Sequence, residues 1–183
     1  MKKLVTTLCL AIIFLSANSQ AYREGENLLN LGIGIGSPYF KTGYQSTVPV
    51  NPTLVYEKAF GENISAGTVF SYAGSKINSY YYGDIKYTAL YIGSRLSYHF
   101  SLKNNSKIDP YLGAGIGYVF VGASGKYGDF VGAVSGIGYS FWGGCRYYFA
   151  KKVSVYAEVG YRSLSVLNVG LSFKMCEFFE TMG

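Results

Sequence analysis

The chain has 183 residues, the length of about one domain, and 14% of them are charged while 17% are aromatic. Soluble domains carry about a quarter charged residues, so this composition excludes an ordinary water-solvated surface. After residue 21 the sequence has no run of about 18 apolar residues, which excludes helical membrane spans as the source of its hydrophobicity.

Residues 1–21 have the three parts of a secretory signal peptide. Lys2 and Lys3 precede an apolar segment over residues 4–15, and small and polar residues follow it. We expect cleavage after Ser19 or Ala21. A membrane anchor is the alternative, which the short apolar segment disfavours.

The chain that remains carries 14 basic and 10 acidic side chains, because two of its 16 Lys and Arg residues leave with the signal peptide. This mild, scattered charge does not indicate a nucleic-acid partner. Two cysteines remain, Cys145 and Cys176. We place them on strands that are not neighbours, so we expect free thiols even in an oxidising compartment.

Eight segments of alternating apolar and polar residues follow the signal peptide, and turn residues separate them. We predict strands over residues 27–37, 53–60, 64–72, 85–100, 111–120, 131–149, 153–163 and 167–175. No helical pattern lies between these segments. The count therefore indicates an all-β protein.

The connections differ in length on the two sides of the predicted strands. Compact polar turns (FGEN, SLKNNSK and FAKK) follow the even strands, and longer links follow most of the odd strands, including AGSKINSYYYGD. Outer-membrane barrels are built with short periplasmic turns and longer extracellular loops. We therefore predict an eight-stranded antiparallel up-and-down transmembrane β-barrel over residues 22–175, with both termini in the periplasm and a C-terminal tail over residues 176–183.

The two faces of the predicted strands differ in chemistry. One face is aliphatic and aromatic, and the other is Gly, Ser, Asn and a few charges. A soluble barrel of the lipocalin kind would need a charged exterior, for which this polar set is too small and too rich in glycine. If the apolar face meets lipid, the polar face points into a narrow lumen that side chains must fill. The glycines of YLGAGIGYVF then leave room for bulky residues across the lumen, such as Arg146 and Tyr156.

Inward parity assigns six charged residues to the lumen: Glu57, Arg95, Arg146, Glu158, Arg162 and Lys174. Their signs are mixed, and isolated buried charges are costly, so we expect a structural ionic network. A gated or selective pore is the alternative. On the outward face we predict membrane-interface positions for Tyr98, Phe100, Tyr139, Phe141, Tyr147 and Phe149.

Three segments carry a family resemblance: PYLGAGIGYVF, GCRYYFAKKVSVYAEVGY and LNVGLSFKM. They resemble the last four strands of small outer-membrane β-barrel domain proteins of Gram-negative bacteria, a porin-like family with OmpA- and OmpX-type barrels. The resemblance implies contact with outer-membrane lipids and insertion by the barrel-insertion machinery. Such chains commonly end on an aromatic residue, whereas ten residues follow Phe173 here. Either Phe173 or the pair Phe178 and Phe179 would then serve as the insertion signal.

His99 is the only histidine, and Ser97 lies two residues away on the same face. A lipid-modifying enzyme would need a histidine beside a hydroxyl and a carboxylate. No nucleophile motif surrounds His99, so we predict a polar residue at the barrel mouth and no enzymatic activity. The segment GIGIG lacks the helix that phosphate binding requires, and no cysteine or histidine cluster has metal-ligand spacing, so we expect no cofactor.

We therefore expect a monomeric, non-enzymatic outer-membrane barrel that supports envelope structure or contacts an unknown extracellular ligand. Tyrosine-rich loops at residues 39–44 and 80–82 and at Tyr127 would make that contact. A minor pore for small solutes is the first alternative, and a lipid-modifying barrel enzyme is the second.

Overall fold

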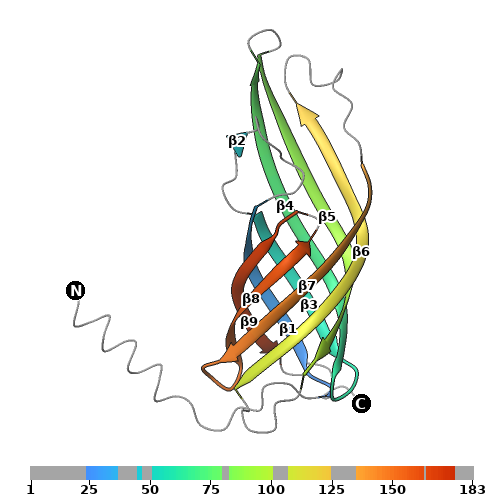
Figure 1. Ribbon diagram of the computed structural model, residues 1–183, viewed down its shortest axis with the longest axis vertical. Helices are drawn as coiled ribbons and strands as arrows, with labels where there is room; N and C mark the ends of the chain where they lie inside the picture. Colours follow the sequence, from blue (N-terminus) through green and yellow to red (C-terminus); the bar gives the residue numbers. More distant parts are fainter. Residues whose placement is uncertain are drawn as a thin grey trace, which may run out of the picture.

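A computed structural model describes residues 24–36, 45–46, 51–79, 83–100, 107–124, 135–162 and 164–175. Eight long strands form a barrel (Figure 1): β1 (Asn27–Ile35), β3 (Asn51–Ala59), β4 (Ile64–Ser79), β5 (Gly83–His99), β6 (Ile108–Ser124), β7 (Gly136–Tyr148), β8 (Val153–Arg162) and β9 (Leu167–Met175). The short strand β2 (Gln45–Ser46) pairs with β4. The predicted signal peptide, the predicted tail and the tyrosine-rich loops lie outside the described residues.

Each long strand pairs antiparallel with the next, and β1 also pairs with β9, where Leu31 lies opposite Leu171. This last pairing completes the barrel, so every long strand pairs with a neighbour on both sides. The predicted eight-stranded antiparallel up-and-down barrel is confirmed. Within the described ranges, no helix is long and apolar enough to span a membrane.

Burial alternates residue by residue along the wall. In β3, Val55 is fully buried while its neighbour Leu54 is 40% exposed, because successive side chains on a strand point to opposite faces. The same alternation leaves Phe141 on β7 62% exposed beside the buried Trp142. Large apolar side chains therefore cover the outside of the barrel, while small, polar and charged side chains fill its interior.

Three strands are much longer than the others. β4, β5 and β6 have 16, 17 and 17 residues, whereas β1, β3, β8 and β9 have 9 or 10. Pairing between β3 and β4 stops at Thr53 and Ser71, but β4 and β5 stay paired as far as Ser79 and Gly83. The three strands thus continue beyond the rim as a longer part of the same sheet (Figure 1). We call this part of the sheet the extension; it comprises residues 74–79, 83–88 and 122–124.

The extension corrects one prediction. The segment AGSKINSYYYGD, residues 73–84, was expected to be a loop, but residues 73–79 and 83–84 are strand. Alternation is weak there because Ala73, Gly74 and Ser75 are all small, so the sequence pattern fades while the backbone ladder continues. The backbone pairing with β5 maintains the strand here, although the side-chain pattern does not indicate one.

Other strand ends also differ from their predicted positions. β1 stops at Ile35 instead of residue 37, because Gly36 adopts a left-handed backbone conformation with φ of 73° that ends the ladder. β7 begins at Gly136 and ends at Tyr148, so its predicted range of 131–149 is too long. Residues 131–134 lie outside the described ranges.

The interior changes from ionic to apolar along the barrel axis. The inward residues of β5 illustrate this change in the order His99, Arg95, Tyr91 and Ala89, with His99 at the end of the short turns. An apolar layer crosses the lumen at the level of Tyr91; it consists of Val55, Val69, Ala73, Ala89, Tyr91, Val119 and Leu164. Leu164 comes from the turn between β8 and β9, and the Asn51 side-chain amide donates to its carbonyl oxygen.

Candidate functional site

The ionic half of the lumen is the candidate site, and Glu57 lies at its centre. Arg95 Nε lies 2.6 Å from Glu57 Oε1, and the Arg146 guanidinium pairs with the other carboxylate oxygen. The three side chains come from β3, β5 and β7, and none of the three residues is more than 2% exposed. Inward parity on three separate strands therefore brings together charges that are up to 89 residues apart in the sequence.

Glu158 on β8 forms the second centre. It accepts hydrogen bonds from Arg95 Nη2 at 2.9 Å and from the Tyr111 hydroxyl at 2.8 Å, and Arg162 pairs with its other oxygen. Arg95 thus joins both glutamates, and its guanidinium stacks over the Trp142 ring at 4.4 Å. Each carboxylate is held by two arginines, which is the arrangement that offsets the cost of burying charge.

Asp109 is a third carboxylate that the sequence analysis missed. Its Oδ2 lies 3.3 Å from Arg146 Nη1, and it is 2% exposed. The predicted strand began at Tyr111, whereas β6 begins at Ile108, so Asp109 shares the inward parity of Tyr111. With Asp109 included, three carboxylates face the three arginines of this network, and its formal charges balance.

Lys174 was predicted to belong to the same network, but the structure places it apart. Its ammonium group lies 2.9 Å from Glu26 and 4.7 Å from the centre of the Tyr148 ring. The Lys174 backbone N–H donates to the Lys152 carbonyl in the β7–β8 turn. Lys174 therefore occupies the end of the barrel that carries the short turns.

His99 lies between a carboxylate and a hydroxyl. Its Nδ1 lies 2.8 Å from Asp109 Oδ1, and its Nε2 lies 2.9 Å from the Ser65 hydroxyl oxygen. Ser97 instead donates to Glu57 at 3.4 Å. The hydroxyl at Nε2 of His99 is therefore that of Ser65 on β4.

Ser65, His99 and Asp109 are the residue types of a hydrolytic triad, and they are hydrogen-bonded in the order that a triad requires. A nucleophile must reach its substrate, however, and Ser65 has 0% exposure. Asp109 is also shared with Arg146, which makes it part of the ionic network. The three residues therefore connect the ionic network to Ser65 on β4. In this structure the Ser65 hydroxyl is too buried to act as an attacking group.

The six predicted interface aromatics include five that are 43% to 62% exposed on the outer wall, and Phe149 is half-buried at the β7–β8 turn. Tyr98 and Phe100 stack edge to face, with ring centres 5.2 Å apart, at the end of the short turns. Tyr139 and Tyr147 lie eight residues apart on β7, which is about 26 Å along a strand. The six residues therefore occupy two levels of the wall, and their contact with the membrane interface stays a prediction.

Cys145 lies on the outer face of β7 as a free thiol. Cys176 is outside the described residues, but it follows β9, and β8 separates β9 from β7. In the described ranges no group of three His, Cys, Asp or Glu side chains is arranged to hold a metal ion.

A family model described as "Outer membrane protein beta-barrel domain" matches residues 7–174, which is most of the chain. The chain belongs to this family. Membership places the protein in the outer membrane, so the apolar exterior of the barrel faces lipid. The match begins at residue 7, inside the predicted signal peptide.

Two solved structures of small outer-membrane proteins are similar to this family member. OprG from Pseudomonas aeruginosa has a TM-score of 0.53 and 14% identity, and the match covers 86% of this chain and 99% of OprG. Neisserial surface protein A has a TM-score of 0.50 and 12% identity, and the match covers 82% of this chain and 95% of that protein. At these identities the likeness shows the fold alone. No curated protein sequence matches the chain.

Proposed function

We propose that this protein is a non-conducting, non-enzymatic outer-membrane barrel that supports the envelope and presents the extension and its loops for contact at the cell surface. The observation that carries the proposal is the filled lumen. Charged residues cross-link its lower half, and an apolar layer crosses it above them.

The two layers oppose a pore in different ways. An ion entering the ionic layer would have to compete with arginine–carboxylate pairs that hold one another across the barrel, such as Arg146 with Glu57. An ion entering the apolar layer would lose its hydration beside aliphatic side chains such as Val55, Val119 and Leu164, which offer no polar partner. The alternative of a minor pore for small solutes finds no support in this packing.

The direction of the barrel follows from its connections. The strands β3, β5 and β7 end, and β4, β6 and β8 begin, at one end of the barrel, together with Glu26 and Lys174, and the extension leaves the other end (Figure 1). Barrels of this kind keep their tight turns in the periplasm. On this basis both termini are periplasmic and the extension lies outside the cell, where its loops can meet a ligand.

Planar-bilayer recording tests the sealed lumen. The wild-type barrel should insert and pass almost no current, because no water-filled path crosses either layer. A variant with Tyr91→Ala and Leu164→Ala removes the two largest groups of the apolar layer and should show more frequent openings. Stable unitary conductance of the wild-type protein would contradict the proposal and favour the pore.

A trimmed variant tests the surface role. Residues 75–87 are replaced by an Asn-Gly turn, which joins β4 and β5 at the paired positions Gly74 and Thr88. In a deletion strain, the trimmed barrel should restore resistance to detergent but not adherence of the cells to surfaces. If trimmed and full-length proteins restore adherence equally, the extension has no surface role.

A further inference from the structure

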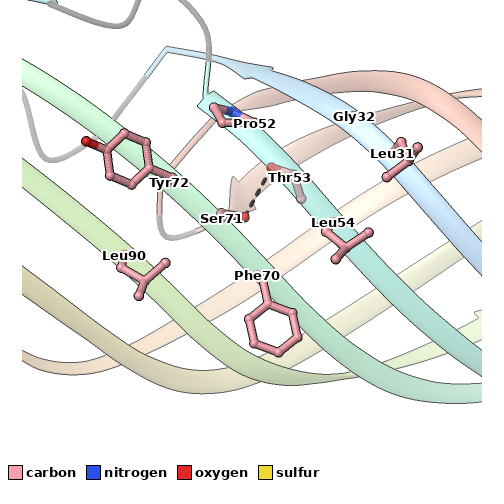
Figure 2. Close-up of a pocket in the computed structure, with 9 residues that line it drawn as sticks. All are labelled: Leu31, Gly32, Pro52, Thr53, Leu54, Phe70, Ser71, Tyr72 and Leu90. Atoms are coloured by element: carbon pink, nitrogen blue, oxygen red, sulfur yellow. Dashed lines mark hydrogen bonds between the residues drawn. The ribbon is translucent and has the colours of Figure 1, made fainter.

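An apolar groove runs across the outer wall where β3 and β4 separate (Figure 2). It has a volume of about 450 Å³. Its lining side chains include Leu31, Pro52, Leu54, Phe70, Tyr72 and Leu90. Thr53 and Ser71 form its floor, with their hydroxyl oxygens 3.1 Å apart.

The groove arises from the end of a strand pairing. Thr53 and Ser71 are the last paired residues of β3 and β4, and Pro52, the residue before Thr53, has no N–H to extend the ladder. Beyond this point β4 continues into the extension while β3 does not. The groove lies beside Tyr72, between this pairing and the pairing of β2 with Ser75 and Lys76 of β4. Outward side chains of β1, β3, β4 and β5 surround the space.

Two lysines lie above the groove on the same outer face. Lys76 and Lys86 are directly opposite each other on β4 and β5, four residues beyond the pair formed by Tyr72 and Leu90. Four residues span about 13 Å along a strand. Two lysines in a cross-strand pair concentrate positive charge at this position, and positive charge near a membrane surface attracts an anionic headgroup.

We propose that the groove and the two lysines bind one anionic membrane lipid, with an acyl chain in the groove and the phosphate between Lys76 and Lys86. The groove lies on the outer wall of an outer-membrane barrel, so lipid acyl chains surround it. The lysine stems are apolar and flexible, and they can extend along the wall to hold a phosphate at the membrane surface.

The order of chemistry along the strands matches that of an amphiphile. Along β4 toward the extension, the residues of outward parity are the apolar Phe70, the amphipathic Tyr72, the small Gly74 and the cationic Lys76. Figure 2 shows Tyr72 at the end of the groove that continues into the extension, with its hydroxyl directed away from Phe70. Inorganic phosphate would use only the lysines and would leave the groove unexplained.

Native mass spectrometry of the detergent-purified full-length barrel tests the site. Three probes are added separately: phosphatidylglycerol, diacylglycerol with the same chains, and inorganic phosphate. We expect one phosphatidylglycerol to be retained at least tenfold more strongly than diacylglycerol, because each lysine contributes to attraction of an anionic headgroup. Inorganic phosphate should neither bind measurably nor displace the lipid.

Variants assign the binding to this position. Lys76→Gln with Lys86→Gln should lower retention of phosphatidylglycerol roughly tenfold, to the level of diacylglycerol, while Lys58→Gln, an outward lysine at the opposite end of the barrel, should change nothing. Leu90→Trp fills the groove and should lower retention of both lipids, whereas Leu96→Trp, lower on the same face of β5, should not. Faster migration of each unboiled variant on a detergent gel checks that it has folded.

Three results would overturn the proposal. Equal retention of phosphatidylglycerol by the double lysine variant and the wild type would exclude the headgroup site. Unchanged retention by Leu90→Trp would exclude the groove. Displacement of the lipid by inorganic phosphate would show a phosphate site that does not use an acyl chain.

Discussion

Arg146 contacts Glu57 and Asp109 in a part of the lumen where all three residues are at most 2% exposed. Parity along the sequence predicted the face of Arg146 and Glu57, because face depends only on position within one strand. It could not predict that they would meet, since the partner across a barrel depends on the tilt and register of all the strands between. Asp109 was not predicted as a lumen residue for a simpler reason. The predicted strand began at Tyr111, after Pro110, whereas β6 begins at Ile108.

Arg146→Ala leaves two carboxylates without this partner in the interior. We expect a loss of unfolding free energy of about 3–5 kcal/mol, because a buried charge that loses its partner keeps its desolvation cost. Urea unfolding in lipid vesicles measures it. The double variant Glu57→Gln with Arg146→Met should lose less than Arg146→Ala alone, and a loss as large as that of the single variant would show that charge pairing is not what Arg146 supplies.

Ser65→Ala removes the hydroxyl that is hydrogen-bonded to His99 Nε2. We expect a modest loss of stability, about 1–3 kcal/mol, because the imidazole nitrogen remains buried without this partner. The lipid composition of the envelope should stay the same in cells that carry Ser65→Ala or His99→Ala. A shift in acylation or headgroup pattern in both variants, with the barrel still folded, would instead support the lipid-modifying enzyme.

At the scale of single strands, β6 combines an outward row of bulky residues with an inward row of glycines. A Cβ on Gly113 would collide with the Trp142 ring, and Trp142 in turn supports the Arg95 guanidinium. The glycine alternation in YLGAGIGYVF thus predicted correctly that inward crowding exists. It could not predict that Trp142 would be the crowding residue, because cross-strand neighbours depend on register.

Gly113→Val should force Trp142 out of position and cost about 1–3 kcal/mol or prevent folding, as overpacking of a filled interior does. Ala114→Val provides the matched control, since Ala114 is the next residue of β6 and is exposed on the outer wall. Migration of unboiled samples on a detergent gel reports the folded fraction. Equal folding of the two variants would mean that the inward face of β6 is not crowded.

For the molecule as a whole, the number of strands and their alternation were predictable, because lipid on one side and a packed lumen on the other impose a period of two on every strand. The lengths of β4, β5 and β6 were not predictable in the same way. The pattern weakens at Ala73, Gly74 and Ser75, which are all small and all buried, although the hairpin continues beyond them.

The orientation can be measured with single cysteines in a Cys145→Ala, Cys176→Ala background. Ser124→Cys, at the end of the extension, should react with an impermeant maleimide in intact cells. Lys151→Cys, in the β7–β8 turn, should react only after the outer membrane is permeabilised, because we place that turn in the periplasm. The reverse labelling pattern would contradict this orientation and would place the termini outside the cell.

The pairing of β1 with β9 has a consequence for biogenesis. The first strand to emerge from the export channel receives its second neighbour only when the last one arrives, since Leu29 pairs with Phe173. Until then both strands are open templates for association with other chains. The polypeptide must consequently be chaperoned in an unclosed form, and a nonsense mutation anywhere before residue 167 should yield a product destined for proteolysis instead of a smaller working barrel.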